Sequence, residues 1–237
     1  WIWDRLRRFA YRHAGAVTAN SLGAVENIRT FVDKERVFFT PNPLPSPLHG
    51  PPAVLPQPTI LAVGRLHRQK GFDILLEAFA LLHASAWNLV ILGEGPEEKS
   101  LRLLTNTLGI AHQIKFMGAI NDPFPYYRGA DIFVLPSRHE GMPNALIEAM
   151  SFGMPCVVSD ASNGISDLIK DGETGLAFPS EKIEALSETL QLVVNNRALR
   201  EKLGLAAKDY MNQRRSRDSS FERWDQAIAS VTQKVAT

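Results

Sequence analysis

Glu140 and Glu148 stand with seven residues between them, and each carboxylate has two oxygens that can accept hydrogen bonds from the hydroxyls of a diol. The apolar run at 131–136 before them suits a buried parallel strand. Pro143 fits the first turn of a helix and Gly153 the position just past its end. Glu140 is therefore predicted in a loop at the carboxyl end of a strand, where open α/β sheets bind ligands, and Glu148 in the helix. Glutamates are also common in loops and on exposed helix faces, so the spacing alone leaves a structural interpretation open.

A second segment, residues 59–71, has the pattern of a strand, a basic loop and the start of a helix. The loop carries Arg65, whose planar fork suits phosphate oxygens, and Lys70, a mobile point charge. The helix that follows adds backbone N–H groups and the positive end of its dipole. This combination predicts a site for a diphosphate, with both side chains exposed. It is not the phosphate loop of ATPases, because Lys70 is followed by Gly71 rather than by Ser or Thr.

Both segments belong to an ordered set of short motifs that runs from about residue 59 to residue 178. The set consists of Val63-Gly64-Arg65-Leu66, Lys70-Gly71, Leu92-Gly93-Glu94-Gly95-Pro96, Phe116-Met117-Gly118, Ala130-Asp131, Leu135-Pro136-Ser137, the segment from Glu140 to Glu148, Gly153-Met154-Pro155-Cys156-Val157-Val158 and Asp171-Gly172-Glu173-Thr174-Gly175. Each motif is weak alone, but the ordered set is highly specific. It resembles the carboxyl-terminal half of the family 4 glycosyltransferases, which are retaining, nucleotide-sugar-dependent enzymes with the two-domain GT-B fold.

The resemblance implies a role for each matching residue. Arg65 and Lys70, next to Gly64, would hold the diphosphate of the donor, Glu148 its ribose, and the turn at Met117 and Gly118 would border its base. The transferred sugar would contact Glu140 and the backbone of Gly141, Met142, Pro143, Asn144 and Ala145. Arg65, Lys70 and Glu140 are the predicted catalytic residues. No cofactor or metal is expected, since the chain has no Asp-x-Asp pair and no His-x-x-x-His pair.

The predicted activity is transfer of a sugar, with retention, from a nucleoside diphosphate donor to a saccharide or lipid-linked saccharide, and family frequency favours a UDP-sugar. The chain does not begin with Met, so we expect it to be a piece of a longer protein whose amino-terminal domain binds the acceptor. Alone it should bind donor weakly and catalyse little or nothing. A nucleotide-sugar epimerase or hydrolase of the same fold and a non-catalytic nucleotide-sugar-binding module remain alternatives. A nicotinamide-dependent oxidoreductase is a weak rival, because Gly93-Glu94-Gly95 lacks the third glycine of the dinucleotide fingerprint.

The chain reads as four parts. Residues 1–45 are predicted as the tail of an acceptor-side α/β domain, 46–58 as a proline-rich linker, 59–213 as a nucleotide-sugar-binding Rossmann-like domain and 214–237 as a terminal crossover helix. Strands are predicted near 59–64, 88–92, 113–117, 131–135 and 155–159, with helices between them and further helices near 181–195, 197–212 and 221–235. This alternation predicts an α/β fold with a parallel sheet covered on both faces, preceded by a fragment of a second α/β domain.

Composition limits the remaining choices. A net charge of +1 with 22% charged residues gives no argument for a nucleic-acid partner. The single cysteine, Cys156, fits a reducing compartment, and no stretch of eighteen or more apolar residues occurs, so we expect a cytoplasmic protein. Residues 1–12 mix aromatics with arginines at helical spacing. Such a segment suits either packing within the first domain or an interfacial helix on anionic lipid, so peripheral contact with the inner face of a membrane stays open.

Overall fold

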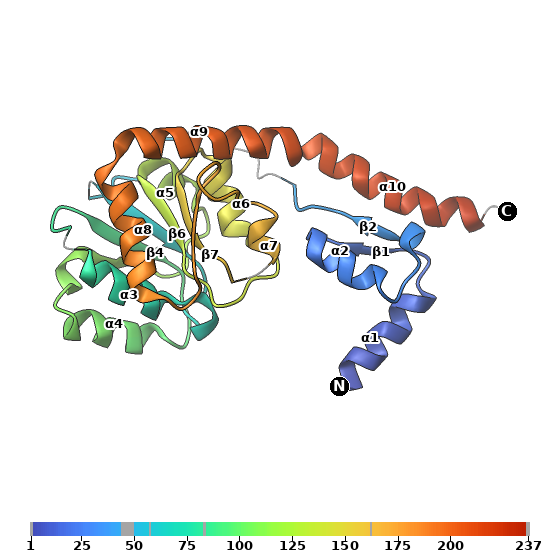
Figure 1. The fold of residues 1–237 in the computed structure, drawn as a ribbon, viewed down its shortest axis with the longest axis horizontal. Helices are drawn as coiled ribbons and strands as arrows, with labels where there is room; N and C mark the ends of the chain where they lie inside the picture. Colours follow the sequence, from blue (N-terminus) through green and yellow to red (C-terminus); the bar gives the residue numbers. More distant parts are fainter. Residues whose placement is uncertain (1, 44–49, 57, 83, 162, 236–237) are drawn as a thin grey trace. The chain divides into compact units, whose positions relative to one another are not determined.

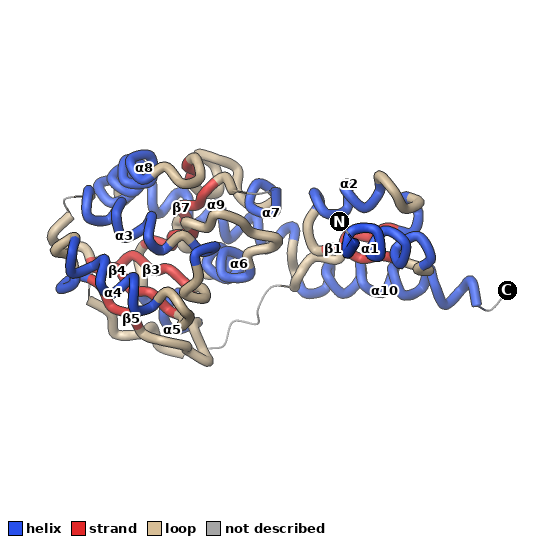
Figure 2. The backbone as a smooth tube through the Cα atoms, turned by 90° about the horizontal axis from the view of Figure 1, so that it is seen from below, coloured by secondary structure: helices blue, strands red, loops and turns tan. Residues whose placement is uncertain are grey.

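Short apolar runs form a six-stranded parallel sheet in the computed structural model, which describes residues 2–43, 50–56, 58–82, 84–161 and 163–235. Its strands are β3 (Thr59–Val63), β4 (Asn88–Leu92), β5 (Ile114–Phe116), β6 (Ile132–Leu135), β7 (Cys156–Ser159) and β8 (Leu176–Phe178). They lie in the order β5-β4-β3-β6-β7-β8, and every neighbouring pair is parallel. β4, β6 and β7 are almost wholly buried, as expected of strands whose two faces are both covered (Figures 1 and 2).

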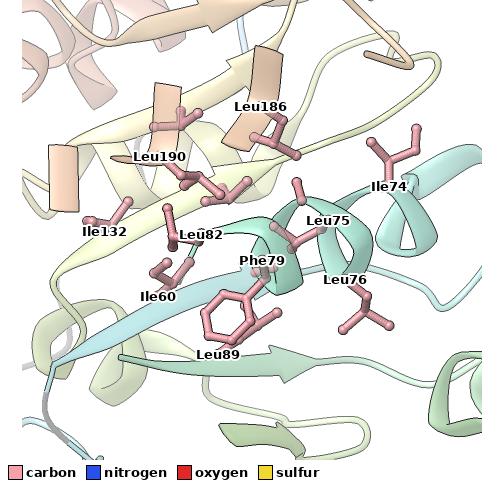
Figure 3. Packing of buried hydrophobic residues seen from close by; sticks show 14 of the residues in the cluster. Ile60, Ile74, Leu75, Leu76, Phe79, Leu82, Leu89, Ile132, Leu186 and Leu190 are labelled. Carbon is pink, nitrogen blue, oxygen red and sulfur yellow. The ribbon is translucent and has the colours of Figure 1, made fainter. Parts of the chain in front are cut away.

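Helices cover both faces of this sheet. One face packs against α3 (Phe72–Leu81), α4 (Glu98–Thr107) and α8 (Ile183–Asn195), and the other against α5 (Phe124–Gly129) and α6 (Asn144–Ser151). Figure 3 shows the first of these interfaces, where alternate strand residues meet α3 and α8. The labelled side chains there are Ile60, Leu89 and Ile132 from the strands, Ile74, Leu75, Leu76, Phe79 and Leu82 from α3 and its end, and Leu186 and Leu190 from α8. Four further helices accompany the sheet among the described residues: the short η2 (Arg68–Lys70), η3 (Ala111–Gln113) and α7 (Asn163–Ser166), and the long α9 (Arg197–Arg214).

The connections of the sheet diverge between β3 and β6. The chain leaves β3 through α3, on one face, and leaves β6 through α6, on the other. The loops at 64–71 and 136–143 therefore flank a topological switch point at the carboxyl edge of the sheet. Open α/β sheets bind their ligands in the crevice at such a point, so the topology alone selects these two loops.

The chain divides into two compact units, one made of residues 45–211 and the other of residues 1–44 with 212–237. The second unit contains α1 (Ile2–His13), β1 (Val17–Ala19), α2 (Leu22–Arg29), η1 (Lys34–Arg36), β2 (Val37–Phe39) and α10 (Arg217–Val235). β1 and β2 form a parallel pair. Its buried residues are Val17, Val25, Ile28, Val32 and Val37. Residues 46–49 and 57 of the predicted linker lie outside the described residues.

The predicted fold class is confirmed: a Rossmann-like parallel sheet with helices on both faces accompanies a smaller α/β part. The five predicted strands of the main sheet are present, and Ser21 caps α2 by accepting a hydrogen bond from the N–H of Ala24 at 3.3 Å. The helix expected between the strands near 113–117 and 131–135 is α5, whereas β8 and the short helix α7 were not predicted. Within the described residues, no helix combines the length and apolar character that crossing a bilayer requires.

Candidate functional site

The loop after β3 is held against the loop after β6 by a glycine. Gly71 has φ +66°, in the left-handed region, and a Cβ there would overlap the carbonyl oxygen of Pro136. Only a residue without a side chain allows both the backbone conformation and the close approach. The turn before it, η2, is capped by His67, whose Nδ1 accepts a hydrogen bond from the N–H of Gln69 at 3.2 Å. Lys70 is thereby presented to the loop after β6.

Lys70 and Glu140 form an ion pair across these loops. Lys70 Nζ donates to Glu140 Oε1 at 2.6 Å, and Ser137 Oγ donates to the same oxygen, also at 2.6 Å. The Glu140 side chain is 6% exposed and that of Lys70 24% exposed. Ser137 is itself fixed, because its carbonyl accepts a 2.5 Å bond from Ser159 Oγ. The expectation that Lys70 is exposed is therefore wrong. Its ammonium group is partly buried and is paired with the buried carboxylate of Glu140.

This pairing also changes what Glu140 can hold. Two donors already occupy Oε1, which uses both lone-pair directions of that oxygen. Hydroxyl groups of a ligand are left with Oε2, unless Lys70 exchanges its partner. The idea that Glu140 offers both oxygens to a diol is therefore corrected by the structure.

Arg138 joins three segments at the carboxyl edge of the sheet. Its guanidinium binds both carboxylate oxygens of Asp73, at 2.8 and 2.7 Å, and donates to Glu181 at 2.8 Å and to the carbonyl of Arg68 at 2.7 Å. Burial raises the pKa of Asp73, but the hydrogen bonds and charge of Arg138 outweigh it and hold that pKa below its usual value. The hydrogen bond to Asp73 in turn raises the pKa of Arg138, against the effect of burial. Arg138 thus connects the loop that carries Glu140 to the turn that carries Lys70.

Glu148 lies on α6 and accepts a hydrogen bond at Oε2 from the hydroxyl of Tyr127, at 2.8 Å. Burial raises the pKa of Glu148, and the bond from Tyr127 opposes part of that rise. Burial, and then the charge of Glu148, keep the pKa of Tyr127 well above its ordinary value, so the phenol stays protonated and acts as the donor. The described contacts leave Oε1 of Glu148 available for a ligand.

A cavity of about 240 Å³ opens beside the carboxyl ends of β3 and β4. It is lined by Val63, Gly64, Leu92, Gly93, Ala119, Ile120 and Pro123. The predicted turn at Met117 and Gly118 leads into it, since the N–H of Gly93 donates to the carbonyl of Gly118 at 2.8 Å. Met117 is 40% exposed. The cavity has an apolar wall and a backbone edge, a combination that suits a flat heterocycle.

The remaining predicted residues lie around these groups. Arg65 is exposed and makes no ion pair or side-chain hydrogen bond within the described part of the chain. Gly141 and Asn144 are exposed, while Met142 and Ala145 are partly buried. Pro143 is buried and is the N-cap of α6, one position before the first turn in which it was expected. The structure thus brings Lys70 and Glu140 into contact, and places Glu148 on the helix that follows their loop.

A larger cavity, of about 540 Å³, lies at the opposite edge of the sheet, around Asp131 and Pro155, which precede β6 and β7. Its lining includes neither Glu140 nor Glu148, and no residue of the basic loop at 64–71. Its greater volume therefore does not mark the site, which the side-chain chemistry and the switch point of the sheet place at the carboxyl edge. No group of three His, Cys, Asp or Glu side chains close enough to hold a metal occurs among the described residues.

Comparison with known proteins shows the family to which the chain belongs. Residues 51–210 match the model of the family described as glycosyl transferases group 1. The chain belongs to the group 1 glycosyl transferases. All the site residues named above lie within the matched region.

Individual relatives agree with the family. The chain is 38% identical over 164 residues to an uncharacterized glycosyltransferase of Haemophilus influenzae, an alignment that covers 67% of this chain and 46% of the relative. It is 31% identical over 173 residues to the lipopolysaccharide core biosynthesis glycosyltransferase LpsE of Rhizobium meliloti, covering 73% of this chain and 50% of that protein. The chain therefore spans about half the length of these curated relatives.

A solved structure confirms the fold of this chain. Anabaena HepE, crystallised with UDP and glucose, superposes with a TM-score of 0.83 at 18% identity, over 95% of this chain and 66% of HepE. At that identity the likeness shows the GT-B fold alone.

Sequence reasoning missed three polar residues that support the site: Tyr127, Ser137 and Arg138. Ser137 occurs in a matching motif, yet nothing in the sequence says that its hydroxyl faces Glu140. Tyr127 and Arg138 leave no local signal, because their partners, Glu148 for Tyr127 and Asp73 for Arg138, lie 21 and 65 residues away.

Proposed function

We propose that the protein to which this chain belongs transfers a sugar from a nucleoside diphosphate donor, with UDP the favoured nucleotide, to a saccharide or lipid-linked saccharide. The observation that carries the proposal is the ion pair between Lys70 and Glu140 at the topological switch point, beside a loop that also presents the exposed Arg65. Cations there suit a diphosphate, and a carboxylate next to them suits the hydroxyls of the attached sugar.

The proposed chemistry depends on where charge develops. As the bond from the anomeric carbon to the diphosphate breaks, the departing oxygen gains negative charge, which Arg65 and Lys70 would stabilise. Removing one such preorganised donor costs about 3 kcal/mol of barrier in other enzymes, or about a hundredfold in rate. Glu140, held by Ser137, would orient the sugar toward the acceptor hydroxyl. Retention of configuration and independence of metal ions are part of this proposal.

The relatives support the choice of substrates. LpsE takes part in lipopolysaccharide core biosynthesis, and HepE was crystallised with UDP and glucose. The cavity at Gly64 and Gly93 would take the base, Glu148 the ribose, and the loop from Gly141 to Ala145 the sugar. Because the chain spans about half of its relatives, we assign the acceptor to the rest of the protein, together with the domain whose tail is residues 1–45.

Work at the inner face of a membrane would suit a lipid-linked acceptor. On α1, the side chains of Ile2, Trp3, Leu6 and Phe9 are 53–83% exposed, and arginines flank them. A different side of the helix contacts the rest of its unit, where the guanidinium carbon of Arg8 lies 4.8 Å from the centre of the Phe31 ring. We propose peripheral contact through the apolar side. Sedimentation with phosphatidylglycerol vesicles, but not with neutral phosphatidylcholine vesicles, should be lost in Trp3→Glu; equal sedimentation of the variant refutes it.

Calorimetric titration with UDP, GDP and ADP in excess EDTA tests the donor site. We expect saturable binding of UDP that Arg65→Ala and Glu148→Ala each weaken about tenfold, while Lys99→Ala, an exposed lysine on α4, leaves it unchanged. Binding that requires Mg²⁺ would refute metal independence. Absence of binding to all three nucleotides would refute the donor site in this chain.

The rival functions separate in activity assays. An epimerase or hydrolase would convert a UDP-sugar without acceptor, whereas a transferase would need one. A binding module would bind nucleotide yet show no turnover in the full-length protein. We expect this chain alone to show no transfer, and full-length protein to transfer sugar with the same anomeric configuration, as read by NMR of the product.

A further inference from the structure

Tyr127 is an enclosed tyrosine that the proposed chemistry does not use. It is 1% exposed, and its ring packs against those of Phe133 on β6 and Phe152 after α6. The ring centroids are 5.9 Å apart for Phe133, and 5.8 Å apart with an interplanar angle of 8° for Phe152. This packing fixes both side-chain torsions of the tyrosine, so the position of its hydroxyl is set by the core and not by solvent.

The hydroxyl has one proton, and that proton is committed to Glu148 Oε2 at 2.8 Å. A glutamate has three side-chain torsions and loses much of that freedom when it must hold a ligand. Here one carboxylate oxygen is already anchored to a rigid donor before any ligand arrives. The rotation of the carboxyl group is then restricted, and Oε1 keeps a fixed direction.

We propose that Tyr127 is a positioning residue that fixes Glu148 for the two hydroxyls of a ribose, and thereby makes the site select ribonucleoside over 2′-deoxyribonucleoside diphosphates. The inference rests on the proposed function, in which Glu148 meets the ribose. The selectivity for ribose would then depend on Tyr127, a core residue that acts on the nucleotide only through Glu148.

The selectivity follows from hydrogen-bond satisfaction. Glu148 is partly buried, so acceptor positions left empty by a missing hydroxyl are not freely refilled by water. Sites built to bind a substrate hydroxyl reject analogues that lack it. If the carboxylate could turn, it would adapt to a deoxyribose with a water molecule; a carboxylate anchored by Tyr127 adapts less.

The test compares UDP with 2′-deoxy-UDP by calorimetry on this chain. The wild type should bind UDP at least about tenfold more tightly than 2′-deoxy-UDP. In Tyr127→Phe the affinity for UDP should fall about tenfold and that for 2′-deoxy-UDP less than about threefold, so that the ratio collapses. The same substitution should have no effect on the ratio in a Glu148→Gln background, because the anchored carboxylate is already gone.

Tyr126→Phe is the matched control, since it removes a hydroxyl from the neighbouring residue of α5 that makes no side-chain hydrogen bond among the described residues. Its ratio should equal that of the wild type. Phe152→Leu keeps the hydroxyl but removes the stacked ring, and should lower the ratio by a smaller factor; it serves if Tyr127→Phe does not fold. A general loss of packing would weaken both ligands equally and leave the ratio unchanged.

The outcomes separate the two proposals. A wild type that binds neither nucleotide refutes the proposed function. A wild type that binds both equally refutes the ribose role of Glu148. A wild type that prefers UDP, with an unchanged ratio in Tyr127→Phe or, where that variant does not fold, in Phe152→Leu, overturns the role of Tyr127 alone.

Discussion

Replacing Lys70 by alanine should lower the free energy of unfolding of the larger unit by about 2 kcal/mol, although lysines of basic loops are usually replaceable at little cost. The reason is Glu140, which is 6% exposed and would keep only Ser137 as a donor. Removing one partner of a fully buried ion pair costs about 3–5 kcal/mol, and of an exposed pair about 0–1 kcal/mol. Lys70, at 24% exposure, lies between these limits.

Denaturant unfolding followed by circular dichroism would measure this effect in Lys70→Ala, Glu140→Ala and the double variant. The coupling between the two sites should be about 1–2 kcal/mol, and the melting temperature of Lys70→Ala should fall by about 4–8 °C, as expected for a unit of this size. Lys99→Ala, which removes an exposed lysine of α4, should change stability by less than about 0.5 kcal/mol. Additive effects of the two single substitutions would refute the pairing and with it the partial burial of the lysine charge.

Three further predictions concern the surroundings of the site. In Arg138→Met the acid sensitivity of the fold should decrease. Arg138 lowers the pKa of Asp73 in the folded state, so the ionised Asp73 carboxylate stabilises the fold above its unfolded-state pKa of about 4. This stabilisation is lost as the pH falls through the folded-state pKa of Asp73, and it is absent from the variant. Unfolding curves between pH 7 and pH 3 measure this, and identical pH profiles would contradict it. Cys156 is wholly buried, which raises its thiol pKa, so a disulfide reagent should modify it only at the rate of unfolding; rapid reaction of native protein would exclude this burial. Gly71→Ala should cost about 3 kcal/mol or more, because the new Cβ meets a carbonyl oxygen, whereas Gly109→Ala, at a similar positive φ in open space, should cost only about 1–2 kcal/mol; equal losses of unfolding free energy would show that the two loops are not in contact.

The sequence predicts the sheet better than the contacts of its side chains. Strands such as β4 are continuous apolar runs, and such runs need little tertiary information to be recognised. β8 is only three residues long and could not be separated from the loop before it. At the site, the chemistry of Lys70 and Glu140 is visible in their side-chain types, but their ion pair joins residues 70 positions apart. Such a pair depends on how β3 and β6 lie side by side, which local pattern does not encode. The packing that encloses Tyr127 depends on tertiary structure in the same way.

The division of the chain into units has a consequence for the order of folding during synthesis. The smaller unit is made from both ends of the chain: Ala227 on α10 is buried, and the guanidinium of Arg223 lies 5.3 Å from the centre of the Phe39 ring. Residues 1–44 are synthesised before residues 45–211, yet they cannot bury Ala227 and complete their unit until α10 has followed, so residues 45–211 should fold before them. Proteolysis of ribosome-bound chains in which Met211 is followed by an unrelated flexible segment long enough to fill the exit tunnel should find residues 45–211 protected and residues 1–44 cleaved, whereas protection of both segments would contradict this order. Residues 1–44 would then acquire their structure after residues 45–211, although they are synthesised before them.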